Sequence, residues 1–275
     1  MSYLSELQQA MIDFRFRPRK NLGQNFVVDE SFVSTLVDAA KLKKTDKVLE
    51  IGPGIGFLTR ALLEKSNVVA VEKDSSLCTL LAEKYGSEKL ELIEGDFLSA
   101  KLPKFNKVVS LPPYNISKDL MLQLFQEDFE LAVLVFQREF VEKLVAEPGF
   151  KEYSVLSVLA DLLYQKEIVQ ATVSPKTFYP KPETFSAAIK FVRKKTQPKI
   201  KDFLGFIFFL KTLFRYRNKN LSNAFKTCAN ELKKIKGFNE KKALDYFVKK
   251  ELDAVKVNLI YPEEFVEIFN SFTAK

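Results

Sequence analysis

The sequence predicts an α/β protein in which an open parallel sheet is followed by a small all-helical C-terminal domain. Apolar runs of strand length alternate with helical stretches, which is typical of parallel strands joined by helical crossovers. A glycine-rich turn follows the first of these runs and leads into a helix. Beyond residue 195 the apolar residues keep helical spacing alone. The expected strands are 48–52, 68–72, 90–94, 107–111 and 131–137.

The chain ahead of the sheet is expected to form a short helix and a basic arm, residues 1–29. Apolar residues recur at helical spacing within 2–13. Lysine and arginine side chains then follow, and we expect them to contact phosphates. Gln24 and Asn25 come next among apolar neighbours, where they are expected to close over a bound nucleoside. A second helix is expected over about 30–40. The basic residues of the arm that we select are Arg17, Arg19 and Lys20.

The turn at 52–56 carries glycine at three alternate positions, so its backbone can approach a ligand closely. Its spacing differs from the G-x-G-x-x-G of dinucleotide enzymes, and Glu50 would be poorly placed beside a pyrophosphate. A carboxylate there suits a ligand with a cationic end, such as S-adenosylmethionine. The alternative is a strand–helix turn that binds nothing.

Each later strand also ends in a chemically informative residue. Glu72 lies where an acidic side chain holds ribose hydroxyls. Asp96 is able to accept a hydrogen bond from an adenine amino group, with Phe97 beside it to stack. Tyr114 follows the fourth strand. Because ligands of open parallel sheets bind outside the carboxyl ends of the strands, these residues are expected to converge with Gly52 on one crevice.

Two further strands are predicted within 164–192, around a proline-rich loop at 174–183. Prolines there are expected to prevent regular strand pairing, and Phe178 and Tyr179 to present exposed or half-exposed rings that stack on a base. The alternative is a braced hairpin that only packs. The domain boundary is placed near residue 194, giving a sheet domain over 30–194 and a helical domain over 195–275.

The helical domain is strongly basic, since residues 201–275 contribute +6 of the net charge of +8. This excess favours a nucleic-acid partner. Arg215, Arg217 and Lys219 form a basic and aromatic cluster at a helix end, which we expect to grip a phosphate backbone. The alternative is a solvated helix terminus.

The composition excludes several kinds of chemistry. The 275 residues include no histidine, so histidine general bases and histidine–metal sites are ruled out. Cys78 and Cys228 lie in unrelated contexts, which predicts neither a disulfide framework nor a zinc site. No leader or membrane-spanning run is visible, so we expect a soluble, cytoplasmic protein. We also expect it to be a monomer and to need no metal.

Taken together, the motifs resemble those of the small-subunit ribosomal RNA adenine N6-dimethyltransferases, in a form closer to the archaeal members. The likeness covers most of the chain. It rests on Leu22–Phe26, Glu50–Gly54 with Leu58-Thr59, Glu72, Gly95-Asp96, Pro113–Ser117, Gln137–Glu139, Pro148-Gly149, Tyr153, Leu156-Ser157, Phe178–Pro182 and Arg217–Lys219.

The resemblance implies a class I, Rossmann-like methyltransferase fold that binds S-adenosylmethionine and pre-30S particles. It implies N6-dimethylation of two adjacent adenines near the 3′ end of the small-subunit RNA, linked to subunit maturation. Tyr114 matches the aromatic residue that stacks on the target adenine. Phe178, Tyr179 and Lys181 join the basic residues as candidate RNA contacts. The residues matched to cofactor contacts, with their neighbours, are Asn25, Val27, Glu50, Gly52, Gly54, Gly56, Glu72, Lys73, Asp96, Phe97 and Leu111.

The catalytic motif of this family departs from its pattern here, over Leu111-Pro112-Pro113-Tyr114. The family places Asn or Asp where this chain has Leu111. That side chain accepts one amino hydrogen of adenine, and a backbone carbonyl, here that of Pro112, accepts the other. With one acceptor lost, activity is expected to fall. Ser110 or Asn115 would have to replace it.

Four hypotheses follow. The first is an active adenine N6-dimethyltransferase. The second is a weak or inactive family member that acts as a ribosome-assembly or RNA-binding factor. The third is a methyltransferase for a transfer RNA or a protein amine, which the motifs of the family disfavour. The fourth is a dinucleotide oxidoreductase, which the glycine spacing disfavours.

Overall fold

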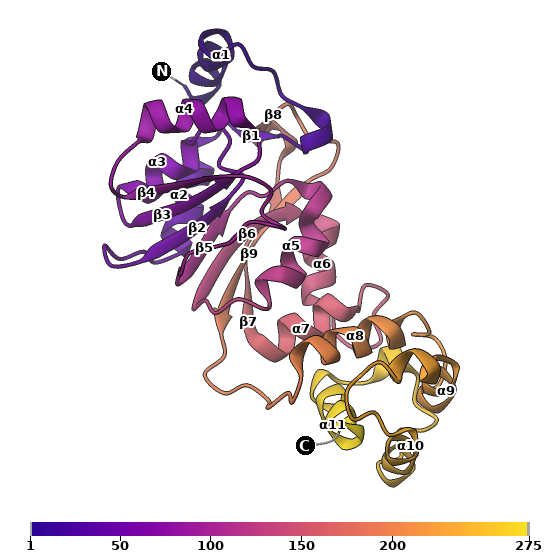
Figure 1. Ribbon diagram of the computed structural model, residues 1–275. Helices are drawn as coiled ribbons and strands as arrows, with labels where there is room; N and C mark the ends of the chain where they lie inside the picture. The colour runs from indigo at the N-terminus through magenta and orange to yellow at the C-terminus, as the bar shows by residue number, and fades with distance from the viewer. Residues whose placement is uncertain (1, 274–275) are drawn as a thin grey trace. The chain divides into compact units, whose positions relative to one another are not determined.

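The computed structural model describes residues 2–273 (Figure 1). The chain divides into two compact units. One takes in the chain as far as Val141 together with Gln165–Arg193, and the other takes in Glu142–Tyr164 and the chain from Lys194 onward. The segment Glu142–Tyr164 therefore belongs to the helical unit, whereas the expected boundaries had assigned it to the sheet domain.

The first unit contains a seven-stranded sheet in the order β4-β3-β2-β5-β6-β9-β7. The five strands from β4 to β6 run parallel, and β9 pairs antiparallel with β6. The predicted α/β fold with parallel strands is confirmed, and the predicted strands agree with the observed ones to within one residue at each end. The strands are β2 (Lys47–Ile51), β3 (Asn67–Glu72), β4 (Leu90–Glu94), β5 (Lys107–Ser110), β6 (Leu131–Gln137), β7 (Tyr164–Val173) and β9 (Ser186–Arg193).

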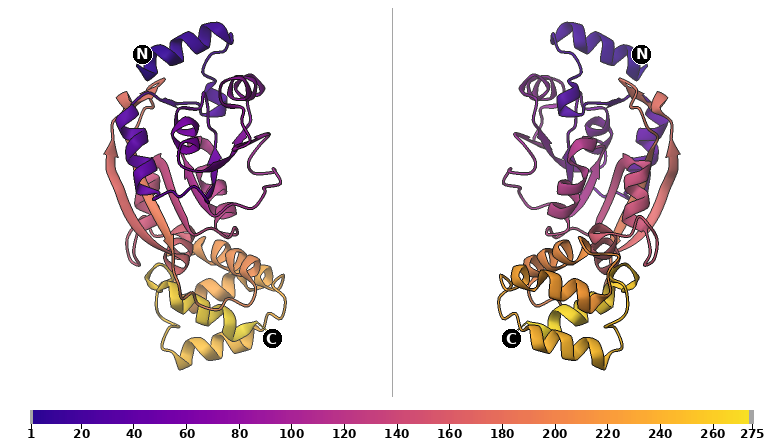
Figure 2. Two further views of the ribbon diagram at one scale, coloured as in Figure 1. Left: turned by 90° about the vertical axis from the view of Figure 1, so that its left-hand side faces the viewer. Right: turned by 90° about the vertical axis from the view of Figure 1, so that its right-hand side faces the viewer.

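The central strands are almost wholly buried, because helices cover the sheet on both sides (Figure 2). This is why they read as continuous apolar runs. The parallel register pairs Ile51 with Val71 and Glu72 with Glu94, so the carboxyl ends of β2, β3 and β4 lie along one edge of the sheet. The helices of this unit are α1 (Tyr3–Asp13), α2 (Glu30–Ala39), α3 (Phe57–Leu63), α4 (Ser75–Tyr85) and α5 (Ser117–Leu124).

The N-terminal helix α1 packs on α3. The ring of Tyr3 stacks on that of Phe57 with centroids 4.0 Å apart, and Arg60 pairs with Glu6 at 3.2 Å. The arm then passes through a short 3₁₀ turn, Lys20–Leu22, and reaches the two-residue strand β1 (Phe26–Val27). These contacts fix both ends of the arm.

The proline-rich loop differs from expectation. Its residues β8 (Phe178–Tyr179) pair antiparallel with β1, with Phe26 opposite Tyr179, so the expected absence of regular pairing is wrong. All three prolines of the loop lie outside Phe178–Tyr179, so both paired positions keep a backbone N–H. Phe178 is 2% exposed and meets Phe32 edge to face, so the expectation of an exposed ring is also wrong. Tyr179 is 36% exposed, as expected.

The helical unit is built around phenylalanine rings. Phe209 contacts Phe265, Phe269 and Phe272 at centroid distances of 5.5–6.4 Å, and Phe225 packs against Phe272. Helix α6 (Arg138–Val145) spans the division between the units. Within residues 2–273 no helix is long and apolar enough to cross a membrane. The remaining helices are α7 (Val155–Leu163), α8 (Phe203–Phe214), α9 (Leu221–Leu232), α10 (Glu240–Lys249) and α11 (Pro262–Phe272).

Candidate active site

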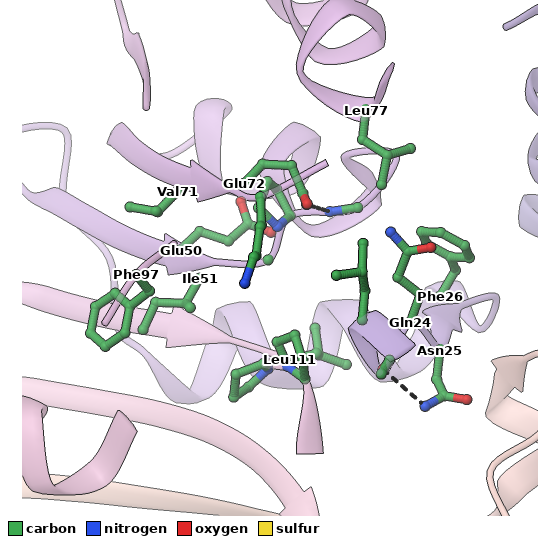
Figure 3. A pocket seen from close by; sticks show the side chains of 18 of the residues that line it. Gln24, Asn25, Phe26, Glu50, Ile51, Val71, Glu72, Leu77, Phe97 and Leu111 are labelled. Atoms are coloured by element: carbon green, nitrogen blue, oxygen red, sulfur yellow. Dashed lines mark hydrogen bonds between the residues drawn. The ribbon is translucent and has the colours of Figure 1, made fainter. Parts of the chain in front are cut away.

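A pocket lies at the carboxyl ends of β2 to β5, between the glycine turn, the arm and the segment that follows β5 (Figure 3). The convergence predicted for Gly52, Glu72, Asp96 and Tyr114 therefore occurs. All of the candidate cofactor residues except Gly56 line this pocket, and so do Pro112 and Pro113. Apolar side chains that sequence reasoning did not select complete the wall: Phe26, Ile51, Ile55, Val71, Leu77 and Ile116.

Gly56 serves the packing of two helices. It precedes α3 with φ of +88°, and a Cβ there would lie 2.3 Å from the ring of Tyr85 and 2.8 Å from Leu81, both on α4. Glycine is therefore required by the close approach of α4, and the structure gives Gly56 no place in the pocket. Gly52 and Gly54, with φ of +68° and +61°, do line it.

Glu72 is held by the backbone around it. One carboxylate oxygen accepts a hydrogen bond from the Gly54 N–H at 3.1 Å, and the other accepts from the Asp74 N–H at 2.9 Å. Burial raises the pKa of this carboxyl. Because each oxygen carries two lone pairs, each keeps acceptor capacity for a ligand in the pocket.

Glu50 lies deeper than the sequence suggested. Its side chain is buried and accepts a hydrogen bond from the Thr59 hydroxyl at 2.7 Å. Burial raises its pKa to about 8, so its carboxyl is protonated near neutral pH in the absence of a cationic ligand. A cation placed beside it would favour the charged form.

Asp96 and Lys73 form an ion pair of 2.8 Å at the mouth of the pocket. The Lys73 ammonium, followed by the Leu98 N–H, lowers the pKa of Asp96. The carboxylate is therefore charged at neutral pH. An amino group of a ligand that donates to the Asp96 carboxylate would therefore bind it alongside the Lys73 ammonium.

The arm is fastened beside the pocket by Asp74, a residue that sequence reasoning missed. The buried Asp74 carboxylate accepts from the Gln24 amide at 3.1 Å and pairs with Arg19 at 3.4 Å. The Gln24 amide oxygen accepts in turn from the Arg19 N–H at 2.8 Å. Arg19 is thus partly committed to the fold, whereas Arg17 and Lys20 are exposed. Asp74 also caps α4, and that role was the only sign in the sequence of its importance.

We call the bonded group of Asp74, Gln24 and Arg19 the Asp74 latch. Asn25 and Val27 follow it in the sequence and line the same pocket. The Asn25 amide donates to the Gly23 carbonyl at 3.2 Å, which leaves its oxygen available as an acceptor. In Figure 3 the arm residues Gln24 and Asn25 lie to the right of the pocket. Leu111 lies below Glu72 in the same view.

Leu111 occupies the wall where the family pattern places an amide or carboxylate, and its half-buried side chain packs against the sheet core. Ser110 does not replace the lost acceptor. Its hydroxyl is buried, donates to the Ile51 carbonyl at 2.7 Å and accepts from the Ile51 N–H at 3.2 Å. Asn115 is exposed and lines the pocket beside Gly23. Of the two substitutes, only Asn115 reaches the cavity.

Tyr114 is anchored from behind. Its hydroxyl shares a hydrogen bond of 2.6 Å with Ser186, the buried first residue of β9, and burial raises its pKa to about 12. The hydroxyl is therefore un-ionised and fixed at physiological pH. One wall of the pocket is formed by this held ring together with Pro112 and Pro113.

Besides the basic residues of the arm, the candidate RNA contacts form two groups. Lys181 is exposed in the proline-rich loop, close in sequence to the half-exposed Tyr179. In the helical unit, Arg215 pairs with Glu231 at 2.6 Å. Arg217 donates to the carbonyls of Lys151 and Phe150 at 2.9 and 3.1 Å. Lys219 is exposed, with its ammonium 5.1 Å from the centre of the Tyr216 ring.

Comparison with known proteins gives a consistent result. Residues 15–273 match the family model described as ribosomal RNA adenine dimethylase. The chain is 38% identical over 237 residues to a probable ribosomal RNA small subunit methyltransferase A of Methanothermobacter thermautotrophicus, covering 86% of this chain and 85% of that protein. It is 37% identical over 259 residues to the protein of that name from Pyrococcus furiosus, covering 93% and 92%.

Solved structures agree. The crystal structure of a dimethyladenosine transferase from Plasmodium falciparum superposes with a TM-score of 0.75 at 27% identity, covering 88% of this chain and 95% of that one. The 23S rRNA methyltransferase ErmE, at 24% identity and a TM-score of 0.64, shares the fold over 90% of this chain and 99% of its own.

Proposed function

Because the chain belongs to the ribosomal RNA adenine dimethylase family, we propose that it transfers methyl groups from S-adenosylmethionine to N6 of adenine in small-subunit ribosomal RNA. The targets we propose are two adjacent adenines near the 3′ end, modified as the subunit matures in the cytoplasm. The observation that carries the proposal is that Glu72, Asp96 and Tyr114 line one pocket.

The pocket fits S-adenosylmethionine by its donor and acceptor set. Glu72 offers two oxygens with spare acceptor capacity for ribose hydroxyls, and Asp96 offers a carboxylate for an adenine amino group. Glu50 would gain a charge beside a cationic ligand. When bound, S-adenosylmethionine supplies a methyl group activated by its sulfonium.

The residues after β5 would orient the target adenine. The ring of Tyr114 would stack on the base, with its orientation fixed by Ser186. The carbonyl of Pro112 would accept one amino hydrogen and direct the lone pair of N6 toward the methyl donor. Asn115 is the side chain in reach of the pocket that would accept the second hydrogen. Rate enhancement then depends on proximity and orientation.

A second candidate function is favoured by Leu111. A leucine cannot accept the second amino hydrogen, and Ser110 is bonded elsewhere. A chain that binds the particle without methylating it would act as an assembly factor, and the exposed basic residues of the arm support RNA binding in either case. We propose that residues 1–29 serve as the closing arm, that the helical domain binds RNA, and that the protein acts as a monomer.

The test is transfer of labelled methyl groups to unmethylated small ribosomal subunits by the chain and by its Leu111→Asn variant, at matched S-adenosylmethionine occupancy. Transfer to adenine N6 by the chain as it stands, lost in Tyr114→Ala, supports the enzyme. An oxyanion-hole-type hydrogen bond is worth about 10²–10³ in rate, so Leu111→Asn should be faster by up to that factor. Transfer by Leu111→Asn alone would establish the second candidate instead.

A further inference from the structure

Phe150 is a large apolar side chain held in the open. It lies in the loop between α6 and α7 and is 61% exposed. The loop itself is firmly held, because the Gly149 N–H donates to the Asn258 carbonyl at 2.7 Å and the Tyr153 N–H donates to the Phe150 carbonyl at 3.2 Å. Because the backbone that carries the ring is already ordered, a ligand that covers the ring has less conformational freedom to remove.

Arg217 is the main brace of this loop. Its two terminal nitrogens donate to consecutive carbonyls, those of Phe150 and Lys151, at 3.1 and 2.9 Å. A guanidinium used in this way has fewer donors left for a phosphate. Its own backbone carbonyl accepts from the Asn258 N–H at 3.0 Å, so the loop, Arg217 and residues 256–258 form one interlocked group.

The surface around Phe150 combines apolar contact area with positive charge. Leu259, 46% exposed, lies beside the loop, since a Cβ on Gly149 would be 3.4 Å from its side chain. Exposed lysines are contributed by each of the three segments, with Glu147 as the exposed acid of the loop. We call this group the Phe150 surface: Phe150, Leu259, Lys151, Lys219 and Lys256.

We propose that the Phe150 surface binds RNA through an unpaired nucleotide whose base stacks on Phe150, and that Arg217 is a positioning residue for this contact. The inference rests on the proposed function only in taking RNA as the partner. An exposed aromatic ring on a loop that is bonded to segments carrying exposed lysines suits a base with its flanking phosphates. A protein partner suits it less well, because lysine is depleted in protein interfaces.

The experiment measures binding of the full chain to unmethylated small ribosomal subunits, at several salt concentrations, together with ultraviolet crosslinking and mass spectrometry. We expect a crosslink between the Phe150 peptide and RNA. Phe150→Leu should bind about tenfold more weakly, because a stacked base is worth about that factor or more. Phe150→Trp should restore binding. Leu204→Ala, an equally exposed apolar residue on α8, is the matched control and should bind like the unaltered chain.

Two further variants separate stacking from charge. Phe150→Leu should leave the salt dependence unchanged, whereas Lys219→Gln should reduce its slope by about one ion. Arg217→Lys keeps the charge but loses the paired carbonyl contacts, so it should weaken binding in the unaltered chain and add nothing to Phe150→Leu. Thermal denaturation checks that each variant is folded.

The inference is overturned if folded Phe150→Leu binds like the unaltered chain, or if Phe150 crosslinks to a ribosomal protein. Methyl transfer read on the same particles keeps this outcome separate from the proposed function. Transfer with unaffected Phe150→Leu binding means that the inference fails alone. Weakened Phe150→Leu binding without any transfer means that the enzymatic proposal fails alone. A chain that binds no RNA would overturn both.

Discussion

The hydroxyl of Ser110 is bonded to both backbone polar groups of Ile51, as donor to the carbonyl at 2.7 Å and as acceptor from the N–H at 3.2 Å. The β2–β5 ladder ends at the pair Leu49 and Val108, so this side chain continues the connection between the two strands beyond their last backbone pair. Ser110 is therefore a structural residue that joins β5 to β2 directly before the pocket residue Leu111.

Removing that hydroxyl should affect stability and leave chemistry intact. Ser110→Ala leaves the buried N–H and carbonyl of Ile51 without their hydrogen-bond partner, which lowers the free energy of unfolding by about 1–3 kcal/mol. Denaturant unfolding measures the loss, and methyl transfer per folded molecule should be unchanged. Transfer that disappears from folded Ser110→Ala would instead make this hydroxyl the missing acceptor. Ser87→Ala, at an exposed position between α4 and β4, is a suitable control.

The hydrogen bond between Tyr114 and Ser186 predicts a coupled pair. Tyr114→Phe keeps the stacking ring but leaves the buried Ser186 hydroxyl without its partner, so we expect a loss of about 1–3 kcal/mol in stability. The rate should fall less than in Tyr114→Ala. Ser186→Ala should behave similarly, and the double variant should cost less than the sum of the two. Additive losses would show that the bond does not hold the ring.

The strands and the convergence of the site were predictable from local signals. Apolar runs with a polar residue at the end of each strand, such as Glu72 and Asp96, identify both a parallel strand and the edge where ligands bind. Because the carboxyl ends of neighbouring parallel strands lie side by side, no further signal is needed to predict that these residues converge. This explains why the predicted pocket residues came together although they span more than sixty positions of sequence.

Sequence reasoning reached less far where a side chain's role depends on a distant partner. Phe178 is buried because it lies opposite Val27, and no local pattern reports a pairing across such a separation. Position 56 must be glycine because a side chain there would collide with Tyr85 on α4. The sequence does not show this, because Gly56 also fits the spacing of a ligand-binding glycine motif. The two carbonyl partners of Arg217 lie more than sixty positions away in the sequence, so only the structure reveals that this side chain also braces a loop.

Gly56 and Gly54 should respond differently to alanine. At Gly56 the new methyl group collides with Tyr85 and the backbone has a positive φ, so Gly56→Ala should lower stability by about 1–3 kcal/mol. Cofactor affinity of the folded fraction should remain near that of the unaltered chain. Gly54→Ala places its methyl against Phe26 in the pocket wall and should weaken S-adenosylmethionine binding directly. Calorimetry of both variants, with and without the cofactor, distinguishes the effects.

The Asp74 latch should control how firmly the arm is held against the pocket. Gln24→Ala removes the amide that joins Asp74 to the Arg19 backbone, so the arm should open more often. We expect faster hydrogen exchange at residues 19–25 and weaker S-adenosylmethionine binding. Gln126→Ala, whose amide bonds only its own helix end, is the matched control. Exchange at 19–25 that matches the unaltered chain would show that Gln24 is not part of the closure.

Glu50 predicts the direction of a pH effect on stability. Unfolded, its carboxyl loses its proton near pH 4.5, whereas the folded protein retains the proton up to about pH 8 because burial raises the pKa. Between these values the folded state binds more protons, so the free energy of unfolding falls as pH rises and levels off above about pH 8. Burial raises the pKa of Glu72 as well, which acts in the same direction.

Glu50→Gln removes the titration while keeping an oxygen that accepts from Thr59. The free energy of unfolding of Glu50→Gln should therefore equal that of the unaltered chain near pH 4. Near pH 9 it should be larger by roughly 3–5 kcal/mol. Denaturant midpoints across this range measure the difference, with the exposed Glu88→Gln as control. A difference that is constant with pH would mean that Glu50 has the same pKa in the folded and the unfolded protein, so that it is ionised at neutral pH. In that case the carboxylate is already charged before any cationic ligand arrives.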